Sequence, residues 1–342
     1  MNPLPSLKPS EIVRQLDKHV IGQHGAKRTL AVAVYTHYRR MLLAAQHGLG
    51  LMKSNILLIG PTGSGKTLLC ETLSRLLGRP FVTADATSLA QTHYVGEEIE
   101  AILHRLLEQA GGDLAQAGQG IVFIDEVDKL KSRDGQINGT SGENVQHALL
   151  KIMEGTSVRL RDGQPIDTTN ILFICGGAFV GLEKIMAKTH SFGFIAADQS
   201  DDQHILDRLN ARVKPTDLQE FGLIPEFAGR LPIVARLAAL TRDELVRILT
   251  EPKEAIARQF AALLAVDRVS LHIAPAVYGQ IADLAMEYKA GARSLRGIFE
   301  EMMTDVLYAV PDNPDIRSVH IASLFSPPEL RREGNSINTG SV

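Results

Sequence analysis

The fold of this chain is decided by one stretch, Ile56-Leu57-Leu58-Ile59-Gly60-Pro61-Thr62-Gly63-Ser64-Gly65-Lys66-Thr67. Its apolar first third predicts a buried strand, and the turn after it opens an amphipathic helix. The turn fits G-x-x-x-x-G-K-[ST], the phosphate-binding loop. Gly63 and Gly65 let backbone N–H groups close around phosphate oxygens, and the N-terminus of the following helix favours negative charge. The stretch therefore predicts that the chain binds a nucleoside triphosphate.

Within this loop, individual side chains have separate expected tasks. Lys66 would reach the β- and γ-phosphates, and the Thr67 hydroxyl would bind Mg²⁺. The other residues expected to contact the nucleotide are Pro61, Thr62, Gly63, Ser64, Gly65 and Leu68. An ordinary glycine-rich loop between a strand and a helix is the plain alternative. The complete motif in its strand–loop–helix context disfavours that alternative.

A second nucleotide signal is the pair Asp125-Glu126 at the end of an apolar run. In a sheet with a phosphate loop, ligands lie at the carboxyl ends of the strands, so these carboxylates are expected to face the phosphates. Asp125 would bind Mg²⁺, and Glu126 would orient and polarise the attacking water. A pair of acids merely solvated at a strand end is the alternative. The pair favours ATP hydrolysis over binding alone.

Composition narrows the class of protein. Hydrophobic residues make up 44% of 342 residues and the net charge is -3, values that are ordinary for a globular protein and give no reason to expect a broad nucleic-acid surface. Cys70 and Cys175 form no C-x-x-C pair, so neither structural zinc nor a disulfide framework is expected. No leader or membrane-length apolar run is visible. We expect a cytoplasmic protein that is not attached to a membrane.

The order of elements predicts an α/β fold with two domains. Apolar strands over 56–59, 80–85, 120–126 and 171–175 alternate with helices, which is typical of a parallel sheet covered on both faces. After Pro232 the pattern becomes mainly helical. We expect a P-loop NTPase large domain over 1–235, a small helical C-terminal domain over 236–325, and a disordered tail over 326–342.

Several segments together resemble the ClpX family of AAA+ protein unfoldases. The resemblance runs from about Pro9 to Ile321 and is carried by Val20 to Gln23, Gly60 to Thr67, Ile121 to Lys129, Leu172 to Phe179, Phe221 to Phe227, Gly229 to Pro232 and Gly291 to Arg296. The last three of these are more specific than the phosphate loop, which many NTPases share. The resemblance implies an AAA+ fold, binding of ATP with Mg²⁺, and assembly into a homo-hexamer.

It also implies site residues outside the phosphate loop. Val20 and Ile21 would flank the adenine ring, although plain core packing is an equal alternative from sequence alone. Arg230 would act as an arginine finger on the nucleotide of the neighbouring subunit, where a planar, always-charged group suits the charge of phosphoryl transfer. Arg293 would be the sensor that couples nucleotide state to the small domain. Together with Lys66 and Glu126, these two arginines form the expected catalytic set.

Substrate handling is assigned to a short aromatic segment. Tyr94, Val95 and Gly96 match the family's pore loop, in which an aromatic ring presses on any polypeptide through contact area. A tyrosine packed against its own domain is the alternative. The glycine-rich segment over 131–142 would be a second pore loop. The expected substrates are unfolded or tagged proteins.

This chain departs from the family pattern in four places. It has no cysteine pairs of a zinc domain, and His93 stands where the pore loop usually begins with glycine. Only 156–169, with Arg159 and Arg161, remains of a longer basic entrance loop. The segment that docks on the ClpP peptidase usually reads Ile-Gly-Phe, whereas here it reads Phe192-Gly193-Phe194. The motor chemistry is therefore expected to be intact, while the substrate and protease interfaces have diverged.

The leading interpretation is an ATP-dependent unfoldase ring, the ATP-binding regulatory subunit of a ClpP-type protease, without peptidase activity of its own. A stand-alone remodelling ATPase that docks no peptidase is left open. The related HslU type is disfavoured because no long inserted domain fits. A nucleic-acid-directed AAA+ loader predicts basic pore residues, which the sequence does not show. A scaffold that binds ATP without turnover is disfavoured by the complete catalytic set.

Overall fold

A computed structural model describes residues 7–48, 51–92, 94–131, 140–190 and 212–332. The chain divides into two compact units. Unit 1 comprises residues 1–16, 23–61 and 66–238, and unit 2 comprises residues 239–342 with the short segments 17–22 and 62–65. No helix in the described ranges has both the length and the apolar composition needed to cross a bilayer.

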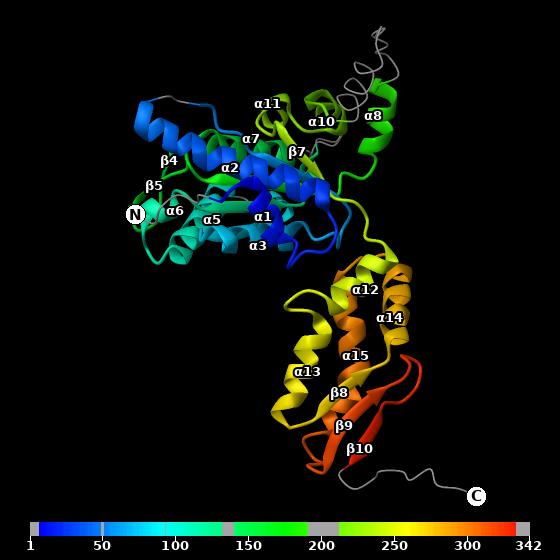
Figure 1. Cartoon of the computed structure of the whole chain (residues 1–342). Coiled ribbons are helices and arrows are strands. Elements are labelled where there is room, and N and C mark those ends of the chain that lie inside the picture. Colours follow the sequence, from blue (N-terminus) through cyan, green and yellow to red (C-terminus); the bar gives the residue numbers. More distant parts are fainter. Residues whose placement is uncertain (1–6, 49–50, 93, 132–139, 191–211, 333–342) are drawn as a thin grey trace, which may run out of the picture. The chain divides into compact units, whose positions relative to one another are not determined.

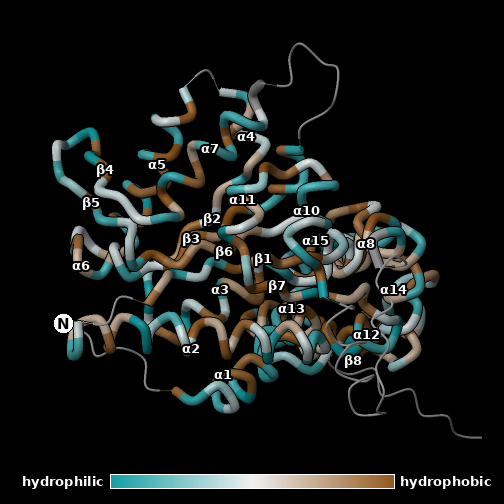
Figure 2. Tube along the Cα trace, turned by 90° about the horizontal axis from the view of Figure 1, so that it is seen from above, coloured by the Kyte–Doolittle hydropathy of each residue, from teal (hydrophilic) through white to brown (hydrophobic). Residues whose placement is uncertain are grey.

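Unit 1 is built on a five-stranded sheet with the strand order β2-β3-β6-β1-β7. Figure 1 labels its edge strand β7, and the order of all five strands can be followed in Figure 2. All four neighbouring pairs are parallel, and Leu57 of β1 pairs with Cys175 of β6 and Val234 of β7. The strands are β1 (Ile56–Ile59), β2 (Phe81–Asp85), β3 (Ile121–Asp125), β6 (Leu172–Gly177) and β7 (Ile233–Arg236). The predicted parallel sheet is therefore confirmed.

Helices cover both faces of this sheet, as Figure 2 shows with α1, α2 and α3 on one side and α5, α7 and α11 on the other. The helices of unit 1 are α1 (Pro9–Leu16), α2 (His24–His47), α3 (Lys66–Leu77), α4 (Ala86–Gln91), α5 (Val95–Gln109), α6 (Leu114–Ala117), α7 (Thr140–Glu154), α8 (Leu182–His190), α10 (Pro215–Phe221) and α11 (Pro225–Gly229), with the 3-10 helix η1 (Val127–Leu130). A hairpin of β4 (Ser157–Arg159) and β5 (Pro165–Asp167) follows α7.

The core of unit 1 explains why its central strands are continuous apolar runs. All four residues of β1 are buried, as are Leu172 to Gly177 of β6. Leu57, Val122 and Phe173 pack in one cluster with Leu103 of α5 and Leu149 of α7. Because successive side chains point to opposite faces, the remaining strand residues pack toward the other helical layer. Burial on both faces fixes the sheet that carries the phosphate loop.

Unit 2 joins helices to a small sheet. Its elements are α12 (Arg242–Thr250), α13 (Ile256–Val266), β8 (Ser270–Ile273), α14 (Pro275–Glu287), α15 (Arg293–Ala309), β9 (Ile316–Ile321) and β10 (Glu329–Arg332). Thr241 caps α12 in a capping box with Glu244. The apolar faces of α12, α14 and α15 meet in one core around Leu249, Ile281 and Phe299. The predicted small, mainly helical second domain is confirmed.

The hairpin of β4 and β5 forms within the segment 156–169 that was expected to be a loop, and two edge strands also differ from the sequence expectations. β7 continues the large sheet where helical structure was expected to begin; it is a four-residue edge strand in which only Ala235 is fully buried, so it leaves little apolar pattern. The expected disordered tail from Ser326 is wrong for Glu329–Arg332, which form β10 antiparallel to β9. All four β10 residues are exposed, so no alternation of apolar residues marks the strand.

Candidate nucleotide site

The phosphate loop leaves β1 and enters α3 in the conformation that the motif predicts. Gly63 and Gly65 have φ of 76° and 96°, in the left-handed region that favours glycine. The amide of Gly60 donates to the carbonyl of Gly177 (3.1 Å), which fixes the start of the loop against β6. Lys66 is buried, and its Nζ donates to the carbonyls of Gly60 (2.7 Å) and Pro61 (3.2 Å). The ammonium therefore lies inside the curve of the loop.

The carboxylates lie at the carboxyl end of β3, next to the loop. Glu126 has φ 60° and ψ 28°, a left-handed conformation that is costly for a residue with a side chain and is often found at functional sites. Its amide donates to Oδ1 of Asp125 (2.9 Å). This conformation lies between the end of β3 at Asp125 and the start of η1 at Val127.

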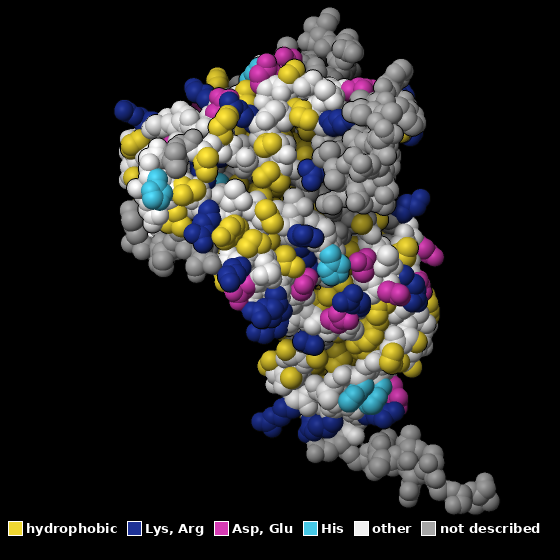
Figure 3. Space-filling model, turned by 45° about the horizontal axis from the view of Figure 1, so that its top comes forward, with side chains coloured by type: hydrophobic (Ala, Val, Ile, Leu, Met, Phe, Trp, Pro, Cys, Tyr) yellow, Lys and Arg dark blue, Asp and Glu magenta, His cyan; other side chains and the backbone are white. Residues whose placement is uncertain are grey.

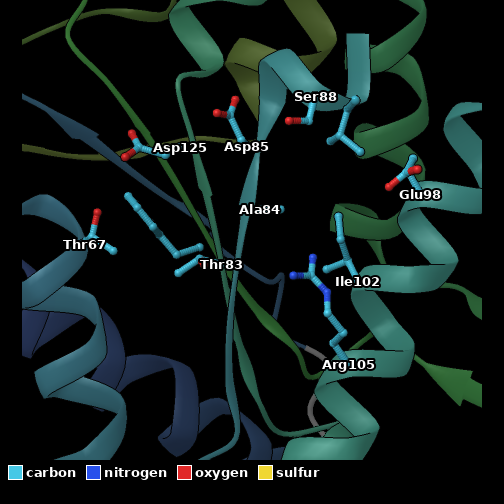
Figure 4. A pocket seen from close by; sticks show the side chains of 11 residues that line it. Thr67, Thr83, Ala84, Asp85, Ser88, Glu98, Ile102, Arg105 and Asp125 are labelled. Atoms are coloured by element: carbon cyan, nitrogen blue, oxygen red, sulfur yellow. The ribbon is translucent and has the colours of Figure 1, made fainter. Parts of the chain in front are cut away.

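A pocket of about 450 Å³ lies beside Thr67 and Asp125 (Figure 4). Thr67 of α3 and Asp125 of β3 line one side of it, and Glu98, Ile102 and Arg105 of α5 line the opposite side. A hydroxyl and a carboxylate facing one space form an oxygen donor set of the kind that Mg²⁺ prefers. The residues present therefore fit a magnesium–nucleotide complex. Behind the loop, burial and the charge of Asp125 raise the pKa of the Cys70 thiol.

Asp128 is a buried residue that the sequence analysis did not single out. Its carboxylate accepts from the amides of Ala178 and Phe179 (both 3.3 Å), directly after β6. A Cβ on Gly177 would lie 2.5 Å from Oδ1 of Asp128, so glycine is needed for the carboxylate to fit. The only signal in the sequence was a third acid in the run after β3.

Arg230 lies far from the phosphate loop of its own chain. Its carbonyl accepts from Nδ2 of Asn55 (3.2 Å), directly before β1, whereas the loop begins at the other end of that strand. Four residues of strand separate the two ends by about 13 Å. The structure therefore brings Lys66, Thr67 and Asp125 together and places Arg230 at the opposite edge of the sheet.

The remaining predicted nucleotide contacts belong to unit 2 or to the surface of α3. Val20 and Ile21 are buried, with 4% and 6% of their surface exposed. Arg293 is the first residue of α15 and is exposed; no side-chain hydrogen bond or ion pair is recorded for it within the described residues. Leu68 is 44% exposed on the first turn of α3.

The aromatic segment lies at the beginning of α5. Tyr94 is the N-cap residue and is 70% exposed, so the alternative of a tyrosine packed against its own domain does not hold in this chain. Val95 and Gly96 form the first turn of the helix, where a loop was expected. His93, most of the second predicted pore loop, and the docking residues Phe192, Gly193 and Phe194 lie outside the described residues.

The fold and this site define the class of protein. Residues 51–234 match the family model of the AAA domain (Cdc48 subfamily), and residues 240–319 match the C-terminal, D2-small domain of ClpB protein. Together with the parallel sheet, the phosphate loop and the paired carboxylates, these matches make the chain an AAA+ ATPase. Its AAA domain binds ATP.

The particular family follows from individual relatives. The chain is 47% identical over 320 residues to the ATP-dependent Clp protease ATP-binding subunit ClpX of Treponema denticola, covering 89% of this chain and 77% of that protein. It is 47% identical to the ClpX subunit of Azotobacter vinelandii over 338 residues (92% and 77%) and 46% identical to that of Bacteroides fragilis over 323 (89% and 77%). The chain belongs to the ClpX family of AAA+ unfoldases, which confirms the resemblance found in its sequence.

Proposed function

We propose that this chain forms a homo-hexameric ring that unfolds proteins by pulling polypeptide past Tyr94, driven by ATP hydrolysis at Glu126. The observation that carries this proposal is the composition of α5. Its N-cap residue is the exposed Tyr94, and its next three turns supply Glu98, Ile102 and Arg105 to the wall of the pocket that Thr67 and Asp125 also line, which we assign to the magnesium end of the nucleotide. A helix moves as a rigid rod over this length, so a change in the pocket would displace the tyrosine.

The hydrolytic step is assigned to groups at the end of β3 and in the phosphate loop. Lys66 would hold the β- and γ-phosphates, and Thr67 and Asp125 would hold Mg²⁺. The metal ion, when bound, neutralises the charge that develops on the phosphate oxygens. Glu126 would accept a proton from the attacking water. Its backbone lies in the left-handed region, and its amide N–H donates a hydrogen bond to Oδ1 of Asp125, the carboxylate assigned to the metal.

Arg230 is proposed to act on the nucleotide of a neighbouring copy. The separation of about 13 Å between the two ends of β1 exceeds the reach of an arginine side chain, so the guanidinium cannot serve the phosphate loop of its own chain. A ring supplies a second copy at that edge. Val20, Ile21 and Arg293 are proposed to contact the adenine and phosphate ends of the nucleotide, in accord with the family pattern.

A Clp-type peptidase is the proposed partner. The relatives are named as ATP-binding subunits of the Clp protease, and this chain is 46–47% identical to them. Docking is assigned to Phe192, Gly193 and Phe194 on the sequence pattern alone. A nucleic-acid substrate is disfavoured, because Figure 3 shows Lys and Arg side chains interspersed with Asp and Glu on the face it presents.

The test combines purified protein, ATP and a tagged fluorescent reporter, with a ClpP-type peptidase added or withheld. We expect ATP-dependent loss of fluorescence in both cases and peptide products only with the peptidase. Loss of fluorescence without peptide products would support the unfoldase activity and contradict the proposed peptidase partner. Intact ATPase that rises with DNA and not with unfolded protein would overturn the proposed function.

A further inference from the structure

Two helices of unit 1 end side by side, and an ion pair joins their ends. Glu154 is the last residue of α7, and Arg230 directly follows α11. Nη2 of Arg230 lies 2.6 Å from Oε1 of Glu154, and the two side chains are 36% and 43% exposed. Gly155 ends α7 with φ 104° and lies against Thr169, so no other residue fits there without displacement. The packing of Gly155 therefore fixes the backbone from which the Glu154 side chain extends to the guanidinium.

The backbone on both sides of this ion pair is held by one buried amide. Asn55 is completely buried, and its Nδ2 donates to the carbonyls of Arg230 (3.2 Å) and Met153 (3.4 Å). Met153 directly precedes Glu154 in α7. Since Asn55 also directly precedes β1, the residues that carry the guanidinium and its carboxylate are both tied to the start of the strand that ends in the phosphate loop.

A second buried amide joins the middle of α7 to the start of α11. Oε1 of Gln146 in α7 accepts from the amide of Ile224, the N-cap residue of α11 (2.8 Å). Its Nε2 donates to the carbonyl of Leu130 (2.8 Å), the last residue of η1, which follows Glu126. Gln146 is completely buried, so both bonds are shielded from water. Asn55 and Gln146 therefore join α7 to the two ends of α11 through buried hydrogen bonds.

The chemistry of this ion pair allows Glu154 to orient Arg230 while the guanidinium still binds phosphate. Guanidinium presents five N–H donors in one plane, and the recorded ion pair to Glu154 involves Nη2, which leaves donors for phosphate oxygens. A long side chain in water samples many rotamers, and the ion pair with Glu154 restricts those of Arg230 before the phosphate arrives. Half-exposed ion pairs contribute little to stability, so this one is not required for folding.

We propose that Glu154 is a positioning residue for Arg230, holding the guanidinium in the orientation in which it meets the nucleotide of the neighbouring copy. This inference rests on the proposed in-trans action of Arg230. The guanidinium arrives already oriented, and Glu154 touches neither the nucleotide nor the water. A change at Glu154 should therefore alter the rate of ATP hydrolysis at the neighbouring site and leave nucleotide binding in its own chain unchanged.

The first test is Glu154→Gln, which keeps the length of the side chain and removes its charge. We expect kcat for ATP to fall about tenfold with KM little changed, because the arginine is misdirected and nucleotide binding is untouched. Glu154→Asp should recover part of the loss. Glu183→Gln is the matched control, since Glu183 forms a similar exposed ion pair with Arg236 (2.8 Å) and should leave kcat unchanged. Wild-type kcat in Glu154→Gln, or a loss equalled by the control, would overturn the proposal.

A mixing experiment separates this proposal from the one on which it rests. Glu126→Gln subunits keep an intact Arg230 but do not hydrolyse ATP. Mixed before nucleotide is added, they should restore ATPase to Arg230→Ala subunits and equally to Glu154→Gln subunits, because each receives an intact arginine from its neighbour. Restoration of Arg230→Ala alone would overturn the role of Glu154 and keep the in-trans arginine. Restoration of neither would overturn both.

Discussion

Tyr94 and Ile102 stand at two ends of one helical segment with opposite environments. Tyr94 caps α5 and is 70% exposed, whereas Ile102 is 2% exposed and lines the pocket that Thr67 and Asp125 also line. Eight residues of helix separate them, about 12 Å at 1.5 Å per residue. This short, continuous connection between the pocket at Thr67 and Asp125 and an exposed aromatic ring is the physical basis of the proposed motor.

Glu126→Gln should bind ATP and not hydrolyse it. The amide cannot accept a proton from water, and general-base catalysis typically contributes at least about 100-fold to a rate. The measurement is phosphate release beside binding of a fluorescent ATP analogue. Glu108→Gln is the control, because Glu108 is exposed on α5 and no catalytic task is assigned to it. Retained hydrolysis would mean that another group activates the water.

Gly176→Ala should weaken the metal site. A Cβ at this position would lie 2.6 Å from the Phe123 ring and 3.1 Å from Oδ1 of Asp125, so the ring must shift and the carboxylate with it. We expect ATPase to fall about tenfold and the Mg²⁺ concentration for half-maximal activity to rise. Gly25→Ala is the control, because the added methyl group would have no atom within 4 Å apart from its chain neighbours and the backbone of its own helix. An unchanged Mg²⁺ requirement would argue against Asp125 as a metal ligand.

His37 should make the protein less stable in mild acid. Burial, and then the charge of Arg40, lower its pKa to about 3, and its Nε2 lies 3.0 Å from the carbonyl of Asn170. The carbonyl can only accept, so the ring is neutral with its proton on Nε2. An unfolded histidine titrates near pH 6.5. Between that pH and about 3 the unfolded state binds more protons, so the free energy of unfolding falls as pH falls.

His37→Gln keeps a donor for the Asn170 carbonyl and removes the titration. Urea unfolding at about pH 7 and about pH 5 should show a smaller loss of stability in this variant than in the wild type. His104→Gln serves as the control, because the His104 side chain is 43% exposed, whereas His37 is buried. Equal losses in all three proteins would show that other groups cause the acid sensitivity.

The sequence predicted the central strands of the large sheet and its edge strand β2, but it missed the edge strands β7 and β10. β1, β3 and β6 are buried on both faces and therefore appear as continuous apolar runs. β7 and β10 are edge strands whose residues are partly or fully exposed, so their positions depend on the partner strand and leave no clear pattern. The phosphate loop and Asp125-Glu126 were found because their motif is continuous in the chain.

Residues that act through long-range contacts could not be found in this way. The distance of Arg230 from its own phosphate loop follows from its bond to Asn55, 175 positions away. Glu154 belongs to no motif and ends a helix, as many glutamates do. Gln146 connects Leu130 with Ile224, and only the packed structure brings those backbone groups to one side chain. Such partners are set by tertiary packing and not by local spacing.

The most direct measurement of the central claim compares wild type, Tyr94→Ala and Tyr94→Phe for ATPase and for unfolding of a tagged fluorescent reporter. Tyr94 is 70% exposed, so its truncation should leave folding and basal ATPase within about twofold of wild type. We predict that Tyr94→Ala loses unfolding and that Tyr94→Phe, which keeps the ring, retains most of it. Unfolding by Tyr94→Ala at the wild-type rate would contradict the proposed link between the nucleotide pocket and the polypeptide through α5.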